Sequence, residues 1–423
     1  MNRRVFLGSL AAGAALLGGR RLRAQSTEVV RLGLIGCGWY GGVILDAALK
    51  AGGVDIVALC DVDSAHLEKT AEKYAAAQGR RPKTFKDWRE LLDVPGLQAV
   101  AIATPPQWHA LPFIEACRRG LDIYCEKPLA YDVREGRAMV DAAKASGRIV
   151  QIGLQRRHSA AIRQAAELIA SGEAGRILAV DAQINYTPNL ADPAPTDPPP
   201  TLDWDAWCGP APKLPYSPQV GHFNWRLEKA YGNGHLVDWG IHWIDAVRTV
   251  LRLGAPRTIQ AAGGLYHLAG RITTPDILTV HFDFDQVPVT WRHRLVAPAS
   301  FAPETNIGMF FYGEKATIFL SDTRYVVIPA GKGAERREVD AKNDQQVEHV
   351  AEFLEAVRTR TPASCTPEDA HRSTSSVQLA MIALESGGRV EWDAARETVR
   401  DNAKANALLK REYRAPWVHP YSA

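Results

Sequence analysis

The sequence lacks the features that mark several classes of protein. Its 423 residues include only six cysteines, with no CxxC pair and no metal-type cluster of cysteine and histidine. This absence argues against a cysteine-ligated metal site, and we predict no bound metal. The cysteines are spaced as small buried apolar residues would be, so no disulfide framework is expected. No internal repeat is visible, which excludes a solenoid or propeller.

A broad positive charge is also missing. The formal net charge is +3, but five arginines and no acidic residue lie within residues 1–24. The rest of the chain is therefore slightly acidic and offers no basic surface for a nucleic acid. With 46% apolar and 23% charged residues, the composition is that of a globular protein, and the length suggests two domains.

The apolar run near the N-terminus, residues 7–19, is too short to span a bilayer, which needs about 20 residues. It follows the pair Arg3-Arg4, and Ala24 is a suitable cleavage position after three further arginines. The pattern predicts a twin-arginine export signal over residues 1–27 and a periplasmic or secreted protein with no stable membrane insertion after cleavage. The alternative is an anchor that is not cleaved.

A glycine-rich turn follows the first apolar strand-like run. Gly36, Gly38 and Gly41 have the GxGxxG spacing, and Asp61 stands twenty residues later at the end of a second run. This order of strand, glycine turn, helix, strand and acid is typical of a dinucleotide-binding βαβ unit. We predict that a dinucleotide contacts Gly36, Gly38, Trp39, Tyr40, Gly41 and Asp61. A carboxylate at position 61 repels a 2′-phosphate, so NAD is favoured over NADP.

The two halves of the chain differ in pattern. Residues 28–153 alternate short buried strands with helices, which predicts an NAD-binding Rossmann domain. Residues 154–395 contain strands such as 277–284 that alternate apolar and polar residues. They predict an α+β domain for substrate binding and oligomerisation, with a large, mostly antiparallel open sheet, and residues 396–423 form a C-terminal tail. Ten of the 26 prolines lie between Pro188 and Pro218, which predicts a long irregular loop.

Two further segments place polar residues at the ends of predicted strands. Thr104, Pro105 and His109 follow the fourth strand, where a Rossmann fold binds its cofactor. Glu126-Lys127-Pro128 ends the fifth strand, so that Lys127 can hold a substrate hydroxyl or relay a proton. We predict that Thr104, Pro105 and His109 contact the cofactor.

The segment from Gly232 to Asp245 predicts a helix with chemistry on one face. Asp238 and His242 are four residues apart, and Asp245 continues the same face. An aspartate that orients a histidine is a common general acid/base unit. The alternative is a capped helix with a solvated polar stripe.

Together, the glycine turn, Glu126-Lys127-Pro128 and the Asp238/His242 helix resemble the glucose–fructose oxidoreductase / inositol dehydrogenase (Gfo/Idh/MocA) family. The resemblance covers about residues 28–395. It implies that Lys127 is the catalytic lysine, Asp238 binds substrate and His242 transfers the proton. It also implies that Glu126 and Lys127 contact the nicotinamide ribose of the cofactor. A cis peptide before Pro128 and a dimer or tetramer are further expectations from the resemblance.

The substrate that this resemblance implies is a small carbohydrate or cyclitol. We predict that Arg157, Trp225, Tyr186 and Asp238 bind it. Because a periplasmic enzyme has no nicotinamide pool, we expect the NAD to be held tightly and recycled. Two alternatives stay open: an NAD-dependent glycoside hydrolase that works by transient oxidation at C3 and elimination, and a non-catalytic sugar-sensing or scaffold protein.

Overall fold

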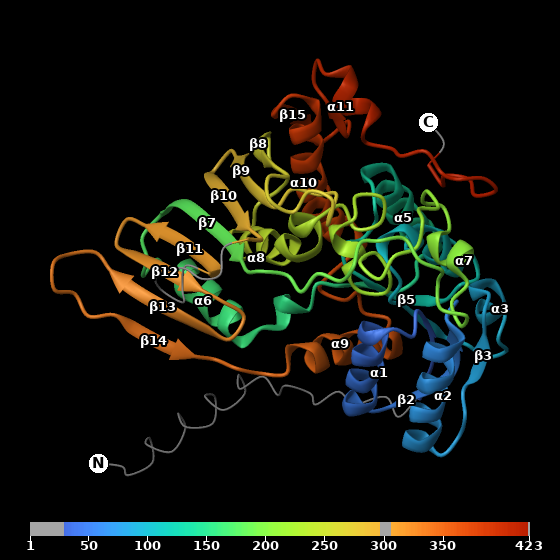
Figure 1. Cartoon of the computed structure of the whole chain (residues 1–423). Helices are drawn as coiled ribbons and strands as arrows, with labels where there is room; N and C mark the ends of the chain where they lie inside the picture. The colour runs from blue at the N-terminus through green and yellow to red at the C-terminus, as the bar shows by residue number, and fades with distance from the viewer. Residues whose placement is uncertain (1–28, 297–305, 422–423) are drawn as a thin grey trace, which may run out of the picture.

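The computed structural model describes residues 29–296 and 306–421, so the predicted export signal lies outside the described residues. Two sheets organise the chain (Figure 1). The prediction of a Rossmann domain followed by a domain with a large, mostly antiparallel sheet is confirmed. Among the described residues, no helix has both the length and the apolar character needed to cross a bilayer.

The first sheet has six parallel strands in the order β3-β2-β1-β4-β5-β6. Its central strands are almost entirely buried because helices cover both faces, as the continuous apolar runs predict. Its strands are β1 (Val30–Ile35), β2 (Val54–Cys60), β3 (Lys83–Phe85), β4 (Ala99–Ile102), β5 (Asp122–Glu126) and β6 (Val150–Gly153). The helices between them are α1 (Trp39–Ala51), α2 (Ser64–Gln78), α3 (Trp88–Leu92), α4 (Ala110–Arg118) and α5 (Val133–Ser146), with the short turn η1 (Pro106–Trp108) before α4. A second short turn, η2 (Gln155–His158), follows β6.

The second sheet has ten strands in the order β14-β13-β12-β11-β7-β10-β9-β8-β15-β16. All neighbours are antiparallel except β10 and β7. Buried and more accessible residues alternate along β9, which confirms one covered face. The strands are β7 (Ile177–Asn185), β8 (Thr258–Gly264), β9 (Ile277–Phe284), β10 (Val287–Arg294), β11 (Ile307–Gly313), β12 (Ala316–Leu320), β13 (Arg324–Pro329), β14 (Arg337–Asp340), β15 (Arg389–Asp393) and β16 (Thr398–Val399).

Helices of the second half return to the first. Helix α9 (Gln345–Thr359) packs against α1, and its Val350, Phe353 and Leu354 share one apolar core with strand β1 (Figure 1). Helix α10 (Pro367–Ser386) packs against α5, β8 and α8 (Ile241–Leu251). The remaining helices are α6 (Ala160–Ala170), α7 (Trp204–Cys208), η3 (Asn224–Leu227), the π-helical turn η4 (Leu236–Gly240) and α11 (Ala403–Ala407). Helices α9 and α10 thus join the two halves of the chain and hold them in a fixed relative position.

The proline-rich loop between β7 and η4 has a core of its own. Trp204 and Trp207 stack at 4.6 Å between ring centroids, and Tyr231 meets both rings edge-on. The Trp108 indole at the end of β4 donates to the Ala206 carbonyl at 2.9 Å. This aromatic packing holds the loop against the carboxyl ends of the Rossmann strands.

Candidate active site

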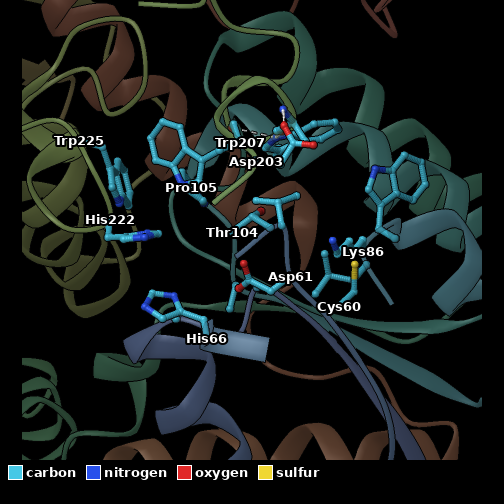
Figure 2. A pocket seen from close by; sticks show the side chains of 18 of the residues that line it. Cys60, Asp61, His66, Lys86, Thr104, Pro105, Asp203, Trp207, His222 and Trp225 are labelled. Atoms are coloured by element: carbon cyan, nitrogen blue, oxygen red, sulfur yellow. Dashed lines mark hydrogen bonds between the residues drawn. The ribbon is translucent and has the colours of Figure 1, made fainter. Parts of the chain in front are cut away.

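A cavity of about 550 Å³ lies at the carboxyl ends of β1, β2 and β4. The glycine turn and Asp61 form one wall, and residues of the proline-rich loop such as His222 and Trp225 form the other (Figure 2). Ligands of open α/β sheets bind at this edge of the sheet.

The glycine turn has the shape of a phosphate cradle. Gly36 has φ +97°, and a Cβ there would lie 2.8 Å from the Ala103 carbonyl carbon. A Cβ on Gly41 would lie 2.0 Å from the Gly36 oxygen, so the turn closes only with glycine. Gly38 caps α1 without a side-chain hydrogen bond and faces open space, which leaves the first N–H groups of this 13-residue helix available to an anion. The residues present therefore fit a dinucleotide.

Asp61 lines the same cavity, close to this helix end. Its carboxylate accepts hydrogen bonds from the Cys37 N–H at 2.6 Å and the Asp63 N–H at 2.8 Å. These bonds fix the carboxylate at the end of β2, and each oxygen keeps a second lone pair for a ribose hydroxyl. The Thr104 hydroxyl, from another residue that lines the cavity, is buried and has no hydrogen-bond partner.

The predicted cofactor residues fall into two groups. Gly36, Gly38, Trp39, Tyr40, Asp61, Thr104 and Pro105 line the cavity, whereas Gly41 supports the turn from behind. The structure does not bring Glu126, Lys127 or His109 to the cavity wall. The His109 ring is fully buried, with Nδ1 2.8 Å from the Pro128 carbonyl and Nε2 2.9 Å from the Thr104 carbonyl. It joins the loops that follow β4 and β5 and thereby positions both.

Lys127 and Asp238 meet from opposite halves of the chain. The Lys127 ammonium donates to the Asp238 carboxylate at 2.7 Å and to its carbonyl at 2.8 Å. Arg226 approaches the other carboxylate oxygen at 3.3 Å and also lines the cavity, so it connects the cavity with this pair. Burial disfavours ionisation of Asp238, but the Lys127 and Arg226 charges outweigh it and hold the pKa of this carboxyl below its usual value. The Lys127–Pro128 peptide is cis, as the family resemblance predicts.

His242 is buried, and its Nδ1 is a buried atom without a hydrogen-bond partner. Burial, with the nearby Arg156 and Lys127 charges, holds the pKa of His242 well below its usual value, so the ring is neutral. The structure does not show Asp238 orienting His242, because the Asp238 carboxylate binds Lys127 and Arg226 instead. Asp238 lies in the π-helical turn η4 and His242 in the regular helix α8 that follows.

Glu126 is buried behind the cavity. Its Oε2 accepts from the Lys127 N–H at 3.2 Å, its Oε1 has no partner, and Gly153 packs directly against the carboxylate. Burial raises the pKa of Glu126 to about 8, against the opposing effect of the Lys127 charge. The site therefore holds a protonated carboxyl next to its lysine at neutral pH.

Replacing Glu126 with glutamine is expected to remove a pH dependence of stability. The folded pKa lies above the unfolded value, so the native state binds more protons between about pH 4.3 and about 8. Protonated Glu126 therefore contributes its full stabilisation below about pH 4.3, and this stabilisation is lost as the pH rises through about 8. The free energy of unfolding of the wild type should fall relative to Glu126→Gln by up to about 1.4 kcal/mol per pH unit.

The measurement is urea unfolding of the nucleotide-free protein at pH 5 and pH 8. The exposed Glu90, changed to glutamine as the control, should keep the wild-type profile. Parallel profiles for wild type and Glu126→Gln would contradict a protonated Glu126.

The structure does not bring Arg157 to the site. Its guanidinium binds Asp245 at 2.9 and 2.5 Å and Asp369 at 2.7 Å, and its side chain is 7% exposed. Asp245 also accepts from the Ser373 hydroxyl at 2.6 Å. Arg157 and Asp245 therefore belong to an ion-pair network that joins η2, α8 and α10. The prediction that Arg157 contacts substrate is wrong, and Asp245 does not belong to the catalytic face.

The other predicted substrate residues lie near the cavity. Trp225 lines it, and the Arg226 guanidinium stacks on the Trp225 ring at 4.4 Å. Tyr186 lines a neighbouring cavity of about 410 Å³ that shares Phe223 with the first. Burial and the Asp238 charge raise the pKa of Tyr186 to about 12, so it remains a hydroxyl donor.

Sequence reasoning missed a histidine pair above Asp61. His222 Nε2 lies 2.9 Å from Asp63, and the rings of His222 and His66 are 4.5 Å apart. In Figure 2 both rings lie on one side of Asp61, with Lys86 on the other. One ligand atom from each of Asp63, His66 and His222 falls within 4.8 Å of the others, which no local Cys/His pattern could reveal. In the described structure this contact joins the long loop to the start of α2.

Sequence reasoning also missed the aromatic end of the cavity, formed by Trp88, Trp108 and Trp417. Trp417 belongs to the C-terminal segment, more than 300 residues from its neighbours, and no motif surrounds it.

Three family models match the chain. An oxidoreductase family with an NAD-binding Rossmann fold (GFO_IDH_MocA) matches residues 30–154. A GFO/IDH/MocA C-terminal domain matches residues 162–319, and an oxidoreductase-family C-terminal α/β domain matches residues 330–419. The matches cover most of the described chain.

Similar proteins include two dehydrogenases. The inositol 2-dehydrogenase of Salmonella typhimurium is 30% identical over 36% of this chain and 44% of its own. The levoglucosan dehydrogenase of Pseudarthrobacter phenanthrenivorans is 33% identical over 41% of this chain and 39% of its own. A glycosyl hydrolase family 109 protein of Stenotrophomonas maltophilia is 36% identical over 30% of this chain and 29% of its own. The chain thus matches less than half the length of each relative.

A solved levoglucosan dehydrogenase, in complex with NADH and levoglucosan, shares the fold. It has a TM-score of 0.67 and 20% identity, and the match covers 89% of this chain and all of that one.

Proposed function

The chain belongs to the Gfo/Idh/MocA family of oxidoreductases, and from this premise we propose that it oxidises or reduces a sugar or cyclitol by hydride transfer to or from NAD. The observation that carries the proposal is the meeting of Lys127 with Asp238 at 2.7 Å, together with the neutral His242, whose pKa the Lys127 charge helps to lower. Arg226, which contacts Asp238 and lines the cavity, links this group to the dinucleotide cradle.

Each of these side chains has a task in oxidation of a carbinol. Bound NAD would accept the hydride. The Lys127 ammonium, held by Asp238, donates a hydrogen bond to the substrate oxygen and stabilises charge that develops on it. His242 is the candidate base for the hydroxyl proton, because its ring is neutral and can therefore accept one. Glu126, behind Lys127, adds no second negative charge while it is protonated.

The substrate side of the site favours a polyhydroxylated ring. Arg226 and Asp238 present a donor and an acceptor that suit neighbouring hydroxyls. Trp225 offers an apolar face, and Tyr186 a hydroxyl, close to the same pair. The inositol and levoglucosan dehydrogenases among the relatives act on the substrates that their names give, which supports a sugar or cyclitol here.

The twin-arginine pattern extends this proposal to an exported enzyme that keeps and recycles its NAD. We expect the mature protein, purified without added nucleotide, to carry about one NAD(H) per chain. Mass spectrometry of the denatured protein measures the nucleotide and its redox state. Protein that elutes free of nucleotide and binds NAD only weakly would contradict the recycling, although not the oxidoreductase activity.

A second candidate function is an NAD-dependent glycoside hydrolase, favoured by the similarity to the family 109 protein. Transient oxidation at C3 makes the C2 proton acidic, so elimination can expel the aglycone. A glycoside labelled with deuterium at C2 would then lose the label to water during hydrolysis. Retention of the label throughout turnover would leave the oxidoreductase as the single proposal.

A further inference from the structure

The C-terminal segment, residues 408–421, does not end on the domain that precedes it. It runs back along α5 to the Rossmann half (Figure 1). One of its residues, Trp417, forms part of the wall of the cofactor cavity. A chain end that contributes to a binding site on another domain can control access to that site.

Buried acidic residues of α5 and its N-cap hold the segment at one side. Arg411 and Tyr413 both bind Glu135, at 3.0 and 2.8 Å, and Glu135 is fully buried. Asp132 accepts from the Arg411 N–H at 3.1 Å and lies 3.1 Å from His419 Nε2. These contacts pin the segment on both sides of Trp417.

A second anchor ties the segment to the proline-rich loop. The Arg414 guanidinium binds the Asp205 carboxylate at 2.8 Å, the Asp205 carbonyl at 3.0 Å and the Gly209 carbonyl at 3.1 Å. The Arg414 N–H donates to the Pro210 carbonyl at 2.9 Å. The segment therefore bridges α5 and the loop that covers the cavity.

Trp417 lies between these anchors. Its ring meets Trp108 edge-on at 4.8 Å between centroids, and the Arg89 guanidinium lies 5.7 Å from it. The same end of the cavity is lined by Lys86 and Trp88, which follow β3. In a Rossmann unit the acid at the end of β2, here Asp61, takes the adenosine ribose, so the adenine belongs toward the β3 edge.

From this arrangement, we propose that the C-terminal segment is a strap over the adenine end of the cavity and that Trp417 is a wall of the adenine site. The strap must detach from α5 or from the loop before the nucleotide leaves. The inference rests on the proposed NAD-dependent function and explains how the cofactor is kept.

The test is the rate of NADH release from the full-length mature protein. Each protein is loaded with NADH and mixed with excess NAD⁺, and the loss of bound NADH fluorescence is followed. Because base–aromatic stacking contributes strongly to binding, Trp417→Ala should release NADH roughly ten- to a hundredfold faster. Trp417→Phe should stay close to wild type. The neighbouring Val418, which is 78% exposed, provides the control Val418→Ala, with unchanged release.

A second variant, Arg414→Ala, loosens the anchor on the loop without removing an aromatic ring and should also speed release. In wild type, NAD⁺ should slow hydrogen exchange of amides within residues 411–419. Equal release rates for wild type, Trp417→Ala and Arg414→Ala, with unchanged exchange, would overturn the strap alone. A wild type that binds no NAD(H) would overturn the proposed function and the strap together.

Discussion

Replacing Lys127 with alanine should lower the rate of hydride transfer by about 10²- to 10³-fold, the range typical of a lost hydrogen-bond donor that stabilises developing charge. The Lys127 ammonium is 2.7 Å from Asp238, and its side chain is 15% exposed. Without it, no cation remains at this position to stabilise charge on the substrate oxygen. NAD binding should persist, because Lys127 is not part of the cavity wall.

The measurement is single-turnover reduction of bound NAD⁺ with a panel of levoglucosan, myo-inositol and hexoses, together with NADH binding by fluorescence. The control is Lys50→Ala, which removes a lysine with a side chain 66% exposed and an ion pair to Asp344 at 3.5 Å. It should behave as wild type. Wild-type turnover by Lys127→Ala, with the panel sugar that wild type oxidises, would remove the lysine from the mechanism.

The second large effect concerns stability rather than chemistry. Arg157→Ala should lower the free energy of unfolding by about 3–5 kcal/mol, because it leaves Asp245 as an unpaired charge in a buried network. The Asp245 side chain is only 2% exposed. The substrate KM should not change beyond the effect of a smaller folded fraction.

Urea unfolding monitored by circular dichroism measures this loss as a shift of the midpoint. Arg163 provides the matched control, since its ion pair with Glu348 is about half exposed on both sides. Arg163→Ala should cost less than about 1 kcal/mol. If Arg157→Ala instead unfolded like the control and raised KM, Arg157 would bind substrate as its sequence position suggests.

The parts of the site that sequence predicts well are local in the chain. The glycine turn, Asp61 and the Thr104–Pro105 turn each follow a buried strand, and the carboxyl ends of parallel strands meet at one edge. Knowing the strands is therefore enough to bring these residues together. The antiparallel sheet is also predictable, because the alternation of apolar and polar residues that indicates it lies within each single strand.

The site residues that the sequence places wrongly are those whose position depends on the direction in which a turn points the side chain. Arg157 follows β6 closely, but the 3₁₀ turn η2 directs it toward α8 and α10 instead of the cavity. The Asp238 carboxylate is held by Lys127 and Arg226, which come from other segments of the chain. His222 and Trp417 reach the cavity from irregular segments, whose paths are set by tertiary contacts alone.

The packing of α9 onto α1 also affects when the Rossmann half can fold during synthesis. The apolar core beneath β1 is completed by Val350, Phe353 and Leu354. A ribosome-bound chain that ends before them leaves one side of the nucleotide-binding half uncovered and exposed to water. That half consequently gains its final stability only when most of the polypeptide has been synthesised, and it needs protection from aggregation until then.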